Sequence, residues 1–364
     1  GELIETEIIF TKKSYAEGRL LRILEKSESR VVPPCPVAGV CGGCNWQHLD
    51  YSTQLNWKRE LVRESLSKFS GFDVSSDEAV QAVVPSPDEF KYRNRVQFHH
   101  QNGRFGFFQR GSHRIVDIDD CPITEEAITS LIPDFKTQFG SKPPGRFEAY
   151  VSQEGPVRTR GPGLQDGESS EDTNDQEEPG GLSFSFSQVN TKQNVNLLRA
   201  VVARFQEQAE LTADPRALQL YDLYAGSGNF TFELLQAFPE ATVTAVELNA
   251  QSVARGNELA QSAYPTRKVR WHQADVLAFL KGNEISPGAL VLIDPPRSGC
   301  DPEVMQILAS SKISYLAYVS CHPVTLARDL KFMKEAGFEL VHTQPFDMFP
   351  QTDHIETLAV LTRS

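Results

Sequence analysis

The stretch Leu218-Gln-Leu-Tyr-Asp-Leu-Tyr-Ala-Gly-Ser-Gly-Asn229 decides the fold of this chain. Its first half is an apolar run of strand length. Its second half is a tight turn, because Gly226 and Gly228 let the backbone bend and come close to a ligand. A helix is expected over Phe230–Phe238 and a second strand over Thr242–Val246. This alternation of strands and helices predicts a parallel sheet with helices on both faces.

Carboxylates follow the predicted strands in a pattern that indicates a cofactor site. Glu247 ends the second strand, 19 residues after Gly228, where an acid can bind the ribose hydroxyls of a dinucleotide. The third glycine of the dinucleotide fingerprint is missing, which argues against NAD and an oxidoreductase. With Asp275 and Asp294 the pattern favours S-adenosylmethionine, which has no pyrophosphate and a cationic methionine end. Asp275 alone could instead be a helix N-cap.

The stretch Tyr315-Leu-Ala-Tyr-Val-Ser-Cys-His-Pro323 is an expected strand that ends at a thiol. In open α/β sheets the carboxyl end of a strand faces the crevice where ligands bind. Asp294 ends another strand, and Asp347–Glu356 places a carboxylate at the mouth of the final strand. A nucleophile, Cys321, an anchoring acid and a possible base on one rim predict an enzyme. The alternative is that Cys321 is a small buried hydrophobe.

Six cysteines are present, and three of them fall within ten residues as Cys35-x5-Cys41-Gly-Gly-Cys44, in a loop rich in proline and glycine. This spacing brings three thiolates within reach of one centre. Cys121 is the natural fourth ligand, because Cys300 lies in the other half of the chain. Four thiolates suit an iron–sulfur cluster or a structural zinc. A single C-x2-C pair favours iron–sulfur, and the alternative is incidental cysteines in a Pro-rich linker.

Charge is distributed unevenly along a chain of net charge −12. Residues 91–114 carry six Lys or Arg and no acid, and they include a hairpin predicted around Asn102-Gly103. Interleaved basic and aromatic side chains suit phosphate contact and base stacking, although a solvated sheet face over an aromatic core is the alternative. Residues 161–181 carry seven acids and no Lys or Arg, so we expect a disordered surface insertion.

The beginning of the chain is expected to form strands around a turn at Lys12-Lys13-Ser14, followed by a helix over residues 50–69. No run approaches the roughly 18 apolar residues that a membrane span needs. No signal peptide is visible, and the cysteine pattern favours a reducing compartment, so we expect a cytoplasmic protein. The first residue, Gly1, is not methionine, which indicates a fragment.

With these motifs placed, the chain resembles the uracil-C5 RNA methyltransferase family, most of all the iron–sulfur members that make 5-methyluridine in 23S ribosomal RNA. The resemblance is carried by Cys35-x5-Cys41-Gly-Gly-Cys44, Phe186-Ser-Gln-Val-Asn190, Asp222-Leu-Tyr-Ala-Gly-Ser-Gly-Asn229, Ile293-Asp-Pro-Pro-Arg297, Ser320-Cys321-x-Pro323 and Asp347-Met-Phe-Pro-Gln-Thr-x-His-x-Glu356. It implies an α/β fold with a Rossmann-like S-adenosylmethionine-dependent domain over 186–364. It also implies a central α+β RNA-binding domain with an iron–sulfur loop over 32–185, and a partial TRAM-like β-barrel over 1–31.

The resemblance further implies roles for individual residues. Cys321 would be the nucleophile and Glu356 the general base. The cofactor S-adenosylmethionine would contact Gln188, Tyr224, Asn229, Glu247, Asp275 and Asp294. A 4Fe–4S cluster would be held by Cys35, Cys41, Cys44 and Cys121. The chain departs from the family where His322 follows the nucleophile in place of the usual Asn or Asp, and where the early TRAM strands are lacking.

Ribosomal RNA is therefore the expected partner of a monomeric enzyme, with transfer RNA as the alternative substrate. A second alternative is an RNA-binding homologue without catalysis, against which the intact Cys321, Glu356 and Asp294 argue. A radical methyl transfer would need a three-cysteine cluster with an open iron, whereas four cysteines are available here.

Overall fold

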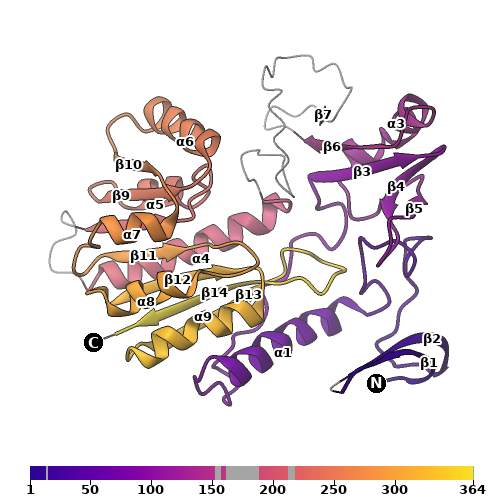
Figure 1. The fold of residues 1–364 in the computed structure, drawn as a ribbon, viewed down its shortest axis with the longest axis horizontal. Coiled ribbons are helices and arrows are strands. Elements are labelled where there is room, and N and C mark those ends of the chain that lie inside the picture. Colours follow the sequence, from indigo (N-terminus) through magenta and orange to yellow (C-terminus); the bar gives the residue numbers. More distant parts are fainter. Residues whose placement is uncertain (14, 152–156, 161–187, 212–217, 364) are drawn as a thin grey trace.

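The computed structural model describes residues 1–13, 15–151, 157–160, 188–211 and 218–363, which form three differently built regions (Figure 1). The acidic insertion predicted over 161–181 lies outside the described residues. So do Phe186 and Ser187 of the Phe186–Asn190 motif.

The C-terminal region is built on a seven-stranded sheet with the order β10-β9-β8-β11-β12-β14-β13. The predicted parallel arrangement is confirmed for the first five strands, whereas β14 runs antiparallel to both of its neighbours. The strand order reverses between β8 and β11, and ligands of open α/β sheets bind at such a switch point. The strands are β8 (Gln219–Leu223), β9 (Thr242–Glu247), β10 (Lys268–Gln273), β11 (Leu290–Ile293), β12 (Tyr315–Ser320), β13 (Glu339–Phe346) and β14 (Glu356–Thr362).

Helices cover both faces of this sheet, as the sequence predicts (Figure 1). One apolar cluster joins a face of the sheet to α7, α8, α9 and α1, and a second joins the other face to α4 and α5. Helix α6 packs against β9 and β10 at the edge. None of the described helices is long and apolar enough to cross a membrane. The helices are α1 (Tyr51–Phe69), α4 (Thr191–Ala209), α5 (Thr231–Ala237), α6 (Ala250–Ala263), α7 (Val276–Gly282), α8 (Pro302–Ser310) and α9 (Pro323–Glu335).

The central region is a five-stranded antiparallel sheet with the order β5-β4-β3-β6-β7. The predicted hairpin is confirmed: β3 and β4 are joined by Asn102 and Gly103, whose φ angles are +52° and +75°, as a tight turn requires. Its core is a cluster rich in phenylalanine. The elements are β3 (Arg95–Gln101), β4 (Arg104–Phe108), β5 (Ile115–Asp117), α2 (Glu126–Thr129), α3 (Ile132–Phe139), β6 (Gly145–Val151) and β7 (Val157–Arg160).

The predicted strands at the beginning of the chain are β1 (Leu3–Thr11) and β2 (Ala16–Glu25), which pair antiparallel as a two-stranded sheet. The predicted helix is also confirmed, as α1, and its N-cap Asp50 accepts a hydrogen bond from the N–H of Thr53 at 2.8 Å. Helix α1 packs against α9, although it lies within the segment 32–185 assigned to the central domain. It therefore carries residues of that segment onto the seven-stranded sheet.

Candidate active site

The pairing of two strands brings the predicted nucleophile and the predicted base together. Ser320 of β12 lies opposite Thr357 of β14. Cys321 continues β12 by one residue and Glu356 begins β14, so the two residues face each other across the ladder. Asp294 follows the end of the neighbouring strand β11 at the same edge. The three side chains that sequence analysis placed on one rim therefore lie on three adjacent strands.

Burial and mutual repulsion hold these groups in their protonated forms. Burial raises the pKa of Cys321 to about 12, and the negative charges of Glu356 and Asp294 act in the same direction. Glu356 is only 3% exposed, and its burial, followed by the charge of Asp294, raises its pKa well above the ordinary range. Burial and the charge of Asp222 raise the pKa of Asp294 as well. These pKa shifts favour the neutral thiol over the thiolate at Cys321.

The thiol lies at the start of a helix whose cap is a histidine. His322 is the N-cap of α9, and its Nδ1 accepts a hydrogen bond from the N–H of Thr325 at 3.3 Å. The His322 N–H in turn donates to Oγ of Ser320 at 3.1 Å. Burial, followed by the charge of Arg297, lowers the pKa of His322, so the ring is neutral and Nδ1 can accept. His322 thus performs the capping that Asn or Asp performs at many helix starts.

The glycine turn after β8 is fixed by the acid at the end of β9. Glu247 accepts from the N–H of Gly226 at 3.0 Å and from the N–H of Asn249 at 2.7 Å. Tyr224, which begins the turn, has a φ of +65°, a conformation that non-glycine residues rarely adopt and that often marks a functional site. The predicted residues Tyr224 and Glu247 therefore shape one turn at the switch point.

Each of the remaining predicted cofactor residues has a hydrogen-bond partner in the structure. Asn229 exchanges two side-chain hydrogen bonds with Asn194 of α4, at 2.8 and 3.2 Å. Asp275 caps α7 by accepting from the N–H of Ala278 at 3.1 Å, which is the alternative considered for it. Gln188 is buried, and its carbonyl accepts from the side chain of Asn94 at 3.1 Å.

Two residues of this region were not identified from the sequence. Asn194 pairs with Asn229 across 35 positions, and no local pattern indicates such a partner. Asp222 is fully buried in β8, and its Oδ2 accepts from the hydroxyl of Thr231 at 2.5 Å. Its Oδ1 has no hydrogen-bond partner among the described residues, and burial raises its pKa to about 7. An acid within an otherwise apolar strand was the available signal.

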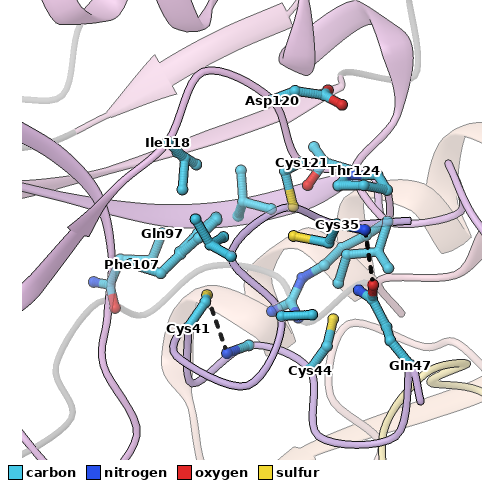
Figure 2. A pocket seen from close by; sticks show the side chains of 17 residues that line it. Cys35, Cys41, Cys44, Gln47, Gln97, Phe107, Ile118, Asp120, Cys121 and Thr124 are labelled. Atoms are coloured by element: carbon cyan, nitrogen blue, oxygen red, sulfur yellow. Dashed lines mark hydrogen bonds between the residues drawn. The ribbon is translucent and has the colours of Figure 1, made fainter. Parts of the chain in front are cut away.

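The four predicted cluster cysteines line one cavity of about 260 Å³ between the Pro-rich loop and the central sheet. Figure 2 shows the sulfur atoms of Cys35, Cys41, Cys44 and Cys121 pointing toward this space. Burial raises the pKa of Cys35, of Cys41 and, to about 12, of Cys44. Among the described residues, no three or more side chains of His, Cys, Asp or Glu are arranged so that they could hold a metal ion. The thiols surround a space and do not converge on one point.

Hydrogen bonds tie the cysteine loop to the predicted RNA-binding hairpin. The N–H of Gly42 donates to the carbonyl of Phe108 in β4 at 2.9 Å. On the hairpin Phe98 is fully buried, as the alternative of an aromatic core expects, whereas the partly exposed rings of His99 and Phe108 stack at 3.9 Å. Three of the six basic side chains of residues 91–114 are exposed: Arg104, Arg110 and Arg114.

Comparison with known proteins agrees with this architecture. Residues 278–364 match the family model of tRNA (uracil-5-)-methyltransferase. An uncharacterized RNA methyltransferase of Bdellovibrio bacteriovorus is 39% identical over 370 residues, covering 99% of this chain and 87% of the relative. A similar protein of Synechocystis is 30% identical, covering 99% of this chain and 89% of the relative.

Among solved structures, the tRNA (uracil-54, C5)-methyltransferase of Pyrococcus abyssi, in complex with S-adenosyl-L-homocysteine, shares this fold. Its TM-score is 0.69 at 23% identity, and the match covers 100% of this chain and 93% of that one.

The fold and the sequence relatives define the class of protein as an RNA methyltransferase. Within that class, the chain belongs to the uracil-C5 RNA methyltransferase family and is an RNA (uracil-C5-)-methyltransferase.

Proposed function

We propose that the protein methylates a uridine of 23S ribosomal RNA at C5, using S-adenosylmethionine and a covalent bond between Cys321 and uracil C6. Glu356 is the base that removes the C5 proton. The observation that carries this proposal is the strand register that sets Cys321 opposite Glu356, with Asp294 on the adjacent strand end.

The reaction needs a nucleophile because uracil C5 by itself attacks a methyl donor poorly. The Cys321 thiolate adds to C6, and the electrons of the C5=C6 bond move to form an enolate that is nucleophilic at C5. After C5 has gained the methyl group, the Glu356 carboxylate takes the C5 proton. The C5–H electrons re-form the double bond, and the C6–S bond breaks to return the thiolate. A base within folded RNA must flip out to reach Cys321.

S-adenosylmethionine, when bound, supplies the methyl group as part of a sulfonium cation. The residues proposed to hold it are Gln188, Tyr224, Asn229, Glu247, Asp275 and Asp294. We add Asp222, whose unpartnered Oδ1 is a buried acceptor suited to the cationic end of the cofactor. The charge of a bound cation would also lower the pKa of the nearby carboxyl groups and of Cys321.

We further propose that Cys35, Cys41, Cys44 and Cys121 hold a 4Fe–4S cluster with a structural role. Four thiols around a single cavity fit a group several atoms wide, whereas a zinc ion would require its ligands to converge on one point. A cluster there would order the Pro-rich loop together with the hairpin to which Gly42 is bonded.

RNA docking is proposed for the central region 32–185, with the catalytic domain over 186–364. Exposed arginines stand at both ends of β4, with Arg104 at its start and Arg110 and Arg114 beyond its end, and His99 and Phe108 offer stacking surfaces on the same hairpin. The β1–β2 sheet, within residues 1–31, is proposed to be part of a TRAM-like module that contacts RNA.

Transfer RNA is the second candidate substrate. The Pyrococcus abyssi enzyme of the same fold acts on uracil 54 of tRNA. The family model that matches residues 278–364 also carries a tRNA name. Ribosomal RNA remains our first candidate because of the cysteine loop, through the family resemblance.

The proposal is tested by incubating the protein with S-adenosylmethionine and 5-fluorouridine-substituted ribosomal or transfer RNA. Fluorine cannot leave C5 as a proton does, so the covalent complex is trapped. Mass spectrometry should find a methylated adduct at Cys321 with ribosomal RNA. A covalent complex formed only with transfer RNA would show that transfer RNA, and not ribosomal RNA, is the substrate. The lack of any adduct would overturn the mechanism.

A further inference from the structure

One face of α1 is polar although it is buried. Gln54 and Lys58, one helical turn apart, have no exposed surface. Lysine and glutamine are rarely buried completely unless their polar groups are paired. Tyr51 lies on the same face one turn earlier, where its hydroxyl accepts from the N–H of Ser86 at 2.8 Å. Lys58 and Gln54 both bond to the loop of residues 347–355, between β13 and β14. Gln54 also donates to the carbonyls of Trp46 and Leu49, at 3.3 and 3.0 Å.

Lys58 holds the beginning of this loop. Its Nζ donates to Oδ1 of Asp347 at 2.5 Å and to the carbonyl of Phe349 at 3.0 Å. Neither side chain of the ion pair is exposed to solvent. A buried, charge-assisted pair with defined geometry fixes direction more than it adds stability.

Gln54 holds the middle of the loop through a reciprocal pair of hydrogen bonds. Its Nε2 donates to Oε1 of Gln351 at 3.0 Å, and its Oε1 accepts from the N–H of Gln351 at 3.0 Å. The carbonyl of Gln351 accepts from the N–H groups of Asn45 and Trp46, at 3.2 and 3.0 Å. Gln351 is therefore bonded through its N–H, its carbonyl and its side chain.

The backbone of Gln351 needs this support. Its φ is +70°, in the left-handed region that costs a non-glycine residue free energy. Such conformations persist where the surrounding contacts determine them, and they are concentrated at functional sites. Five residues later the same loop ends at Glu356, which pairs with Phe346 across the β13–β14 ladder.

We propose that Gln54 and Lys58 are positioning residues: by clamping Asp347 and Gln351, they hold the carboxylate of Glu356 at the angle from which it removes the uracil C5 proton. This inference rests on the proposed function. The clamp acts on the last chemical step, because addition of Cys321 to C6 and methyl transfer do not use Glu356. A loosened clamp therefore delays removal of the proton and the breaking of the C6–S bond, and the methylated adduct accumulates.

The test is Gln54→Met, which keeps the volume of the side chain and removes both hydrogen bonds to Gln351, together with those to the carbonyls of Trp46 and Leu49. With unmodified RNA and S-adenosylmethionine we expect kcat to fall roughly 100-fold, as for a misplaced catalytic group, while KM for RNA stays within about threefold. Intact-mass spectrometry should show a methylated protein–RNA adduct building up. The matched control is Ser65→Ala on the same helix. Ser65 is buried, and its hydroxyl donates to the carbonyl of Leu61 within α1 at 2.7 Å.

Gln351→Gly keeps the test decisive if Gln54→Met does not fold. Glycine adopts a φ of +70° without strain and keeps the three backbone hydrogen bonds, but it loses the side-chain bond to Gln54. A smaller loss of kcat with the same accumulation of adduct is expected. Wild-type kcat in either folded variant, or an equal loss of adduct formation and turnover, would overturn the clamp. If the wild-type protein also formed no adduct with 5-fluorouridine RNA, the proposed function itself would fail.

Discussion

The active-site rim and the cysteine cavity are built in opposite ways. At the rim, Cys321, Glu356 and Asp294 are fixed by the ladder of β11, β12 and β14, whose register leaves little freedom. At the cavity, three of the cysteines come from one irregular loop and the fourth from the segment between β5 and α2. The sheet therefore holds the rim residues in position before any ligand binds. The positions of the cysteines instead depend on a few loop hydrogen bonds and on the group proposed to bind between them.

The largest expected effect is on activity, and it distinguishes the active-site rim from the cysteine cavity. Cys321→Ala should abolish both turnover and the covalent adduct, because no other group can add to C6. Cys121→Ser should instead remove the visible absorbance of an iron–sulfur protein while leaving the affinity for S-adenosylmethionine, measured by calorimetry, unchanged. Cofactor affinity lost in Cys121→Ser would show that the two regions are not separate.

The second prediction concerns the pair that joins α1 to the rim. Lys58→Met should lower the free energy of unfolding by about 3–5 kcal/mol, because it leaves the Asp347 charge buried without its partner. Lys281→Met is the matched control: its bridge to Glu303 at 2.8 Å is half exposed and is worth roughly 0–1 kcal/mol. Chemical denaturation of each variant measures the change in the free energy of unfolding. Equal losses would show that the Lys58–Asp347 pair behaves as a surface contact.

The buried Asp222 of β8, next to the rim strand β11, predicts how the stability of the protein changes with pH. Asp222 has an ordinary pKa of 3.8, which burial raises to about 7 in the folded protein. Between these values the folded state keeps a proton that the unfolded chain has lost, so stability falls as pH rises, by at most about 1.4 kcal/mol per unit. Asp222→Asn should flatten this part of the curve between pH 4.5 and 7. If stability fell with pH as steeply in Asp222→Asn as in the wild type, the raised pKa of Asp222 would not be the cause.

The smallest expected effect is at the cap beside the nucleophile. His322→Ala should cost about 1 kcal/mol, and His322→Asn much less, because asparagine also caps helices well. The pKa of His322 is lowered from 6.5 in the folded state, so its cap is complete above pH 6.5 and is lost as pH falls below that value. Thermal melting at pH 5 and 7.5 measures this. A His322→Ala variant that keeps the wild-type pH dependence would exclude the cap as its source.

The sequence was sufficient for the parts of the fold whose determinants are local. The glycine turn after β8, the strand ending at Cys321 and the Asn102-Gly103 hairpin each follow from side-chain period and turn chemistry. The antiparallel direction of β14 was not predicted. It decides the site, because it turns the first residue of the last strand, Glu356, toward the same edge as Cys321.

Contacts over long sequence distances could not be read from local patterns. Asn194 and Asn229 lie 35 positions apart, and Gln54 and Gln351 lie 297 apart. A signal for the second pair did exist: four-residue steps back along α1 from the buried Leu66 and Val62 reach Lys58 and Gln54. Lysine and glutamine are rarely buried completely unless they are paired. The distant loop supplies partners for both, which the local pattern of α1 does not reveal.

Some predictions from the sequence stay predictions. Asp275 has its N-cap role in the structure, and its contact with the cofactor is still to be tested. Domain boundaries at 31 and 185 do not coincide with every packing contact, because α1 lies against α9. The iron–sulfur cluster also stays a prediction, which the single C-x2-C pair and the four thiols around one cavity favour.

The most direct test of the central claim is intact-mass spectrometry of Glu356→Gln with unmodified RNA and S-adenosylmethionine. Glutamine keeps the shape of the side chain but cannot accept the C5 proton, so elimination should stall. The predicted result is a stable adduct with the mass of protein, RNA and one methyl group, mapped to Cys321 and absent from Cys321→Ala/Glu356→Gln. Turnover at the wild-type rate, or an adduct on another residue, would contradict the account.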